Sequence, residues 1–89
     1  MKVDLQKFGE ILVSRPAGRE ACLVARAYLA PKNGTEPIEL DFSGVMVLAP
    51  SWVDEFTSGL RETWPNPIIF LPSDNASVIE SLKMLGEKL

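Results

Sequence analysis

Histidine is missing from this 89-residue sequence, and cysteine occurs once, at Cys22. Without an imidazole, neither a Ser-His-Asp nor a Cys-His catalytic arrangement can be assembled, and the usual zinc ligand sets are incomplete. A single cysteine cannot form an internal disulfide, and its apolar surroundings in "ACLVARAYL" favour core packing over a reactive thiol. We therefore expect a non-catalytic chain that binds no metal and no cofactor.

Long apolar runs and basic clusters are missing too. The apolar runs end after about half a dozen residues, whereas roughly 20 are needed to span a bilayer. The net charge is −3, and the nine Lys and Arg side chains are spread along the chain without forming a basic stripe. We expect a soluble, cytoplasmic protein that binds neither membranes nor nucleic acid. With 46% hydrophobic residues, a chain of this length buries one modest core, which predicts a single domain over residues 1–89.

Apolar periodicity and turn residues predict three strands that alternate with three helices. The strands are expected at residues 1–5, in "PIELDFSGVMVLA" (37–49) and in "IIFL" (68–71). The helices are expected at about 16–29, in "SWVDEFTSGLRETW" (51–64) and at 76–88. The order β-α-β-α-β-α predicts an α/β fold with a mostly parallel (mixed) sheet and helices packed on it. The unbroken run "VMVLA" further predicts a central strand covered on both faces.

The segment "IELDFSGVMVLAPSWVDEFTSGL" resembles the STAS domain, named for sulphate transporters and anti-sigma-factor antagonists. It is most similar to the STAS-like branch of small bacterial domains. Those carry an LDFSGV-type strand, then a serine, then an acidic pair at a helix start. The upstream "SRPAGREA" is similar to the Ser-Arg helix entry of that branch, so the resemblance extends from about Phe8 to Leu60.

This resemblance implies a regulatory role. In anti-sigma-factor antagonists, the loop between the central strand and the next helix holds a hydroxyl that a partner kinase phosphorylates, and the same surface docks that partner. The corresponding loop here runs from Leu48 to Ser51, and Ser51 is its only hydroxyl. The family's Asp-Ser-Ser-Gly run is replaced by Ala-Pro-Ser-Trp, and an ungapped alignment places Pro50 on the phosphorylated position. By its place in the loop, the resemblance implies Ser51 as the phosphoacceptor.

Ser51 and Trp52 each allow two interpretations. Ser51 followed by Asp54 is typical of a capping box, yet a serine at a helix N-terminus is also a suitable place for a phosphate. Trp52 beside two acids is typical of a half-exposed interface anchor, but it also fits packing at the margin of the core. Asp54 and Glu55 are adjacent on a helix and point about 100° apart, so they do not converge as catalytic carboxylates.

We therefore predict a regulatory module that docks a protein through five residues: Ser51, Trp52, Asp54, Glu55 and Ser58. The acidic character of this surface predicts a partner with a basic patch, such as a kinase-like anti-sigma-type regulator. Arg15 is expected to cap a neighbouring loop or to pair with Asp41.

Two other hypotheses belong to different classes of function. A small-ligand binder or enzyme would use a pocket at the carboxyl ends of the strands, where the polar candidates are Asp41, Ser43, Ser51 and Ser73. A homodimer would pair the edge strand at residues 1–5 with that of a second copy.

Overall fold

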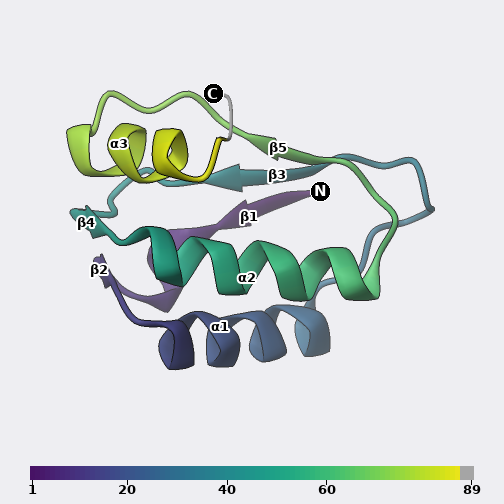
Figure 1. Cartoon of the computed structure of the whole chain (residues 1–89). Coiled ribbons are helices and arrows are strands. Elements are labelled where there is room, and N and C mark those ends of the chain that lie inside the picture. Colours follow the sequence, from purple (N-terminus) through teal and green to yellow (C-terminus); the bar gives the residue numbers. More distant parts are fainter. Residues whose placement is uncertain (87–89) are drawn as a thin grey trace.

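A computed structural model describes residues 1–86 of the chain and shows an α/β fold (Figure 1). Three helices alternate with the strands of a parallel sheet, as the sequence predicted. The elements are β1 (Lys2–Asp4), a 3-10 turn η1 (Leu5–Phe8), β2 (Ile11–Leu12), α1 (Arg15–Tyr28), β3 (Ile38–Asp41), β4 (Val47–Leu48), α2 (Pro50–Thr63), β5 (Ile68–Phe70) and α3 (Ala76–Met84). The helix predicted at 76–88 is shorter in the structure: Leu85 and Gly86 follow its last residue, Met84, and residues 87–89 lie outside the described range.

The strands form two parallel sheets. The main sheet has the order β1-β3-β5, so β3 is its central strand, and the smaller sheet pairs β2 with β4. Ile11 is the register partner of Val47, and Leu12 that of Leu48. The long strand predicted at 37–49 is therefore two short strands, β3 and β4, separated by a bend. In the same way, η1 separates β1 from β2.

Helices cover only one face of the main sheet. Val3, Leu40 and Phe70 stand side by side in register and are buried, whereas their chain neighbours Lys2 and Ile69 are exposed. Both crossovers, β1 to β3 and β3 to β5, move in the same direction across the sheet. Because such connections are right-handed, their helices are placed on the same face. The predicted burial on both faces was wrong, since Met46 and Val47 in "VMVLA" are exposed.

The turn between β3 and β4 packs against η1, which lies between β1 and β2. Gly44 adopts φ +85°, a conformation that favours glycine, and the Gln6 side chain of η1 occupies the place where a Cβ of residue 44 would lie. The Asp41 carboxylate stabilises the same bend by accepting hydrogen bonds from the Ser43 N–H at 2.9 Å and its hydroxyl at 2.7 Å. These contacts fix where β3 ends and where β4 begins.

Glycines allow α1 and α2 to pack closely side by side (Figure 1). Gly18 of α1 lies against the backbone carbonyl of Trp52 in α2, and Gly59 of α2 lies against the Cys22 sulfur of α1. On α2, the predicted stripe of Val53, Phe56 and Leu60 is fully buried. The two helices therefore share one core with the sheet.

Side chains of α3 occupy the outer edge of β4. The Ser77 hydroxyl accepts from the Leu48 N–H at 2.9 Å, and Ser81 donates to the Leu48 carbonyl at 2.5 Å. The Asn75 amide donates to the carbonyls of Val45 at 3.0 Å and Met46 at 3.2 Å, while its oxygen caps α3. These three side chains act as a substitute for a neighbouring strand, so this edge of β4 is satisfied.

The close approach of α1 and α2 predicts the effect of Gly18→Ala. Alanine favours a helix over glycine by about 1 kcal/mol, but the added methyl group would collide with the Trp52 carbonyl. A backbone carbonyl, unlike a side chain, cannot rotate out of the way. We therefore expect the free energy of unfolding, measured in urea, to fall by about 1–3 kcal/mol. Gly34→Ala is the control: its nearest neighbour would be Pro65 at 3.9 Å, and its stability should change by less than about 0.5 kcal/mol. An unchanged or higher stability of Gly18→Ala would contradict the close approach.

Candidate docking surface

Two strand-to-helix junctions meet at one end of the molecule. β2 leads into α1 and β4 leads into α2, and the pairing of β2 with β4 holds the junctions side by side. Arg15, the first residue of α1, connects them: its Nη1 lies 2.8 Å from Asp54 Oδ2 and 3.3 Å from Glu55 Oε2. The hydrogen bonds to Asp54 and then to Glu55 raise the pKa of Arg15, so the guanidinium stays charged. The expected pairing of Arg15 with Asp41 was wrong; Asp41 pairs with Lys2 instead.

Ser51 is not a helix cap. α2 begins at Pro50, its N-cap is Ala49, and no side chain caps it. Ser51 is therefore the second helical residue, partly exposed, and within residues 1–86 its hydroxyl has no hydrogen-bond partner. The capping-box interpretation was wrong because Pro50, which lacks an N–H, already fits the first helical position.

Four of the predicted docking residues share one face of α2. Ser51, Asp54, Glu55 and Ser58 are spaced at i, i+3, i+4 and i+7, which places them one above another on a helix. Asp54 and Glu55 are partly exposed and both contact Arg15, while Ser58 is exposed and lines a groove between α1 and α2. These four residues remain available to a partner.

The fifth residue, Trp52, is buried. Only 1% of it is exposed, and its ring stacks on Phe56 with the centroids 5.0 Å apart and lies 6.4 Å from Phe8. The interpretation of Trp52 as a half-exposed interface anchor is corrected to core packing. The physical reason is that α1 passes over this turn of α2, with Gly18 against the Trp52 carbonyl. Substitution of Trp52 would therefore test the core and not a surface contact.

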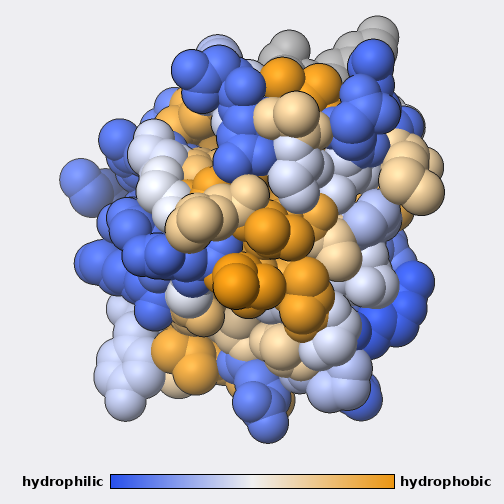
Figure 2. Space-filling view, turned by 90° about the vertical axis from the view of Figure 1, so that its left-hand side faces the viewer, coloured by the Kyte–Doolittle hydropathy of each residue, from blue (hydrophilic) through white to orange (hydrophobic). Residues whose placement is uncertain are grey.

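An exposed apolar cluster lies at the same end of the molecule and was missed in the sequence. Its members are Ile11, Val13, Met46 and Val47, which are 41–64% exposed. Figure 2 looks onto the side that carries β2 and β4 and shows an apolar area near its centre. In the sequence these residues belong to short apolar runs. No local pattern distinguishes an exposed apolar run from a buried core strand. We call these four residues the end cluster.

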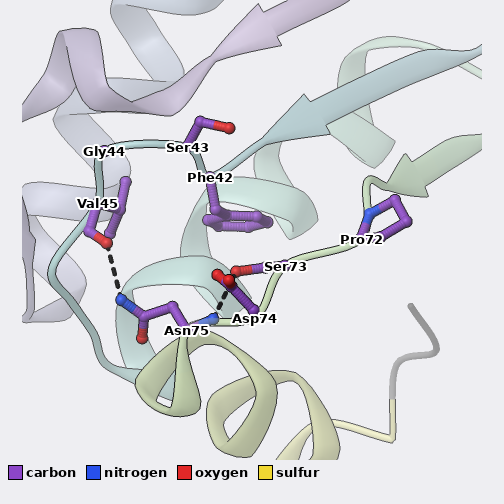
Figure 3. A pocket seen from close by; sticks show the side chains of 8 residues that line it. All are labelled: Phe42, Ser43, Gly44, Val45, Pro72, Ser73, Asp74 and Asn75. Atoms are coloured by element: carbon purple, nitrogen blue, oxygen red, sulfur yellow. Dashed lines mark hydrogen bonds between the residues drawn. The ribbon is translucent and has the colours of Figure 1, made fainter.

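A second hollow lies at the carboxyl ends of β3 and β5 and has a volume of about 510 Å³ (Figure 3). The β3–β4 loop forms one wall and the β5–α3 loop the other. Ser43 lies on one side of the Phe42 ring and Ser73 on the other, so the two hydroxyls do not converge (Figure 3). Both are also engaged, since the Ser43 hydroxyl donates to Asp41 and Ser73 Oγ accepts from the Asn75 N–H at 3.1 Å. Asp41 and Ser51 do not line this hollow.

Other reactive groups are arranged for structure. Burial raises the pKa of the Cys22 thiol, which is 3% exposed in the core. In residues 1–86, no three or more Cys, Asp or Glu side chains are grouped to hold a metal ion. Within the same residues, every helix is too short or too polar to cross a membrane.

Comparisons of the chain with protein-family models, with curated proteins and with solved structures found no match. The similarity to the STAS domain therefore rests on the sequence segments quoted above.

The hydrogen bonds to Asp41 predict a pH dependence of stability. Its pKa is lowered by the Ser43 N–H first, then by the Ser43 hydroxyl and by Lys2. In the unfolded chain the carboxyl has an ordinary pKa of about 3.9, so ionised Asp41 stabilises the fold above that pH. This stabilisation is lost as the pH falls through the lower, folded-state pKa.

We expect Asp41→Asn to lower the urea midpoint at pH 7 and to flatten its decline between about pH 5 and pH 2. Asp74→Asn, at an exposed position on the β5–α3 loop, is the control and should keep the wild-type slope. Parallel pH profiles for wild type and Asp41→Asn would show that the Ser43 and Lys2 contacts contribute nothing.

Proposed function

We propose that this chain is a non-catalytic regulatory module of the anti-sigma-factor-antagonist type, which docks a protein partner where β2 and β4 lead into α1 and α2. The observation that carries the proposal is the end cluster, whose four apolar side chains are exposed beside the first turn of α2. Contiguous exposed apolar side chains on a small protein are typical of an interaction site. The docking surface thus comprises the end cluster together with Ser51, Asp54, Glu55 and Ser58.

The composition of this surface supports protein binding. An apolar centre with a charged, solvent-accessible rim is the usual arrangement of a protein–protein interface. Here the rim contains Arg15 with Asp54 and Glu55, whose charges sum to −1. The whole chain has a net charge of −3. A partner with a basic patch would complement it, and its association would slow as salt rises.

The small-ligand alternative has less support. The hollow in Figure 3 occupies the usual place for a ligand in an open α/β sheet. Its hydroxyls are separated by Phe42 and already make hydrogen bonds within the protein. We therefore favour docking.

Charge placed in the end cluster should abolish docking. We expect Ile11→Glu and Met46→Glu each to lower the recovery of partner at least ten-fold, because a carboxylate would be desolvated at the apolar centre. The measurement is affinity capture from the native cell, quantified by mass spectrometry, with urea unfolding to confirm that each variant folds. Met84→Glu is the matched control, since Met84 is 76% exposed on α3. Equal losses for Met84→Glu, or full recovery with both cluster variants, would contradict the proposal.

We further propose that phosphorylation of Ser51 weakens docking. A phosphate carries about −1.5 to −2 charges and would stand beside the apolar centre, where docking would have to remove its water; this desolvation opposes binding more than attraction to the basic partner favours it. Ser51→Asp should lower partner recovery several-fold, whereas Ser51→Ala should retain it. Thr63→Asp, at the far end of α2, is the control for added charge. If Ser51→Asp and Thr63→Asp behave alike, Ser51 is not the switch.

A further inference from the structure

We propose that the open edge of β2 binds an extended peptide segment of a protein partner, in which apolar side chains and lysine or arginine share one face. This inference rests on the proposed docking function. It adds the backbone geometry of the contact and the chemistry of the partner segment.

The strand edges of the protein differ in how they are protected against pairing. β1 presents the exposed charges Lys2 and Asp4, and β5 is flanked by Pro67 and Pro72. β4 is satisfied by side chains of α3. β2 has β4 on one edge, and no other strand of residues 1–86 pairs with it. It also presents Ile11 to solvent and is followed by the exposed Val13, and neither of its two residues is charged or proline.

The backbone of β2 offers matching groups at this edge. In a parallel ladder, both polar groups of one residue point the same way and those of the next residue point the opposite way. The carbonyls of Glu10 and Leu12 accept from β4, from the Val47 N–H at 3.1 Å and the Ala49 N–H at 2.9 Å. The N–H and C=O of Ile11 and Val13 therefore point away from β4. They are spaced as an added strand requires.

An apolar hollow of about 230 Å³ lies beside this edge, between β2 and α1. Ile11 and Leu12 of β2 line it together with Ala17, Ala21 and Val24 of α1, and no residue of β4 takes part. The small side chains of Ala17 and Ala21 leave room for an apolar side chain of an added strand.

The charges around the hollow specify the other half of the segment. Glu20 is the only ionisable group in the lining, and Glu10 is exposed immediately before Ile11. A lysine or arginine two residues from the inserted apolar side chain would lie on the same face of the added strand and complement these carboxylates.

A second copy of the chain fits this surface less well than a segment does. Fully burying an aliphatic side chain removes roughly 60–120 Å² from water, so four side chains about half exposed offer on the order of 200 Å². A stable interface between folded proteins needs about 800 Å² on each side. An extended segment needs only a free edge and a place for one or two side chains.

The test uses a capped seven-residue peptide in which valine and lysine take every second position, so that they share one face, with threonine between them; it is titrated into the ¹⁵N-labelled chain and followed by NMR. We expect the largest amide shifts at Ile11 and Val13, with further shifts in the first turns of α1. A peptide of the same sequence, N-methylated at its three central peptide bonds, should bind at least ten-fold more weakly because it cannot donate to the β2 edge. Glu20→Gln should weaken binding about two- to five-fold, and Glu80→Gln on α3 should leave it unchanged.

Three results would overturn the inference: no binding at millimolar peptide, equal binding of the N-methylated peptide, or shifts centred on β1 or β5. Self-association through β2, seen by sedimentation at increasing protein concentration, would assign the edge to a second copy instead. Each result leaves the docking function separately testable, because Ile11→Glu and Met46→Glu report on partner capture without the peptide.

Discussion

The close contact between α1 and α2 determines most of what this protein presents to its surroundings. Gly18 allows the backbone of α1 to reach the Trp52 carbonyl, and the Trp52 ring packs in the core against Phe56. Once Trp52 is inside, helical spacing directs Ser51, Asp54 and Glu55 outward. The same contact brings Arg15 within reach of both acids. The packing of α1 against α2 thus contributes both to the core and to the polar rim of the docking surface.

The second constraint is how each strand edge is satisfied. In a small sheet most strands lie at an edge, and unpaired edges invite association. α3 resolves this for β4 by using Asn75, Ser77 and Ser81 as hydrogen-bonding side chains. Nothing equivalent in residues 1–86 covers β2, although its side chains Ile11 and Val13 are apolar and exposed. The outer edge of β4 is thus protected, whereas the outer edge of β2 is open. A partner would therefore bind at β2 and not at β4.

Ligand binding and protein docking need different surfaces, and the hollow and the end cluster, which both lie beyond the carboxyl ends of the main-sheet strands, differ in that way. The carboxyl ends of β3 and β5 carry hydroxyls, but Phe42 separates them and internal hydrogen bonds already engage them. The surface formed by β2, β4 and the first turn of α2 has an apolar centre with charged groups around it. That contrast supports the proposed docking, whereas the proposal of a regulatory role rests on the resemblance of "LDFSGVMVLAPSWVDEF" to STAS domains.

The sequence by itself determined the α/β class, the alternation of strands and helices, and the buried stripe of Val53, Phe56 and Leu60, because these depend on local periodicity and turn residues. Only the tertiary structure decided that Trp52 is buried, that Met46 and Val47 are exposed, and that Arg15 pairs with Asp54 and Glu55. Likewise, α2 begins at Pro50, one residue before the predicted start, so Ser51 lies inside the helix and does not cap it. A pattern of apolar residues shows which side chains share a face, but whether that face is covered depends on elements distant in the chain.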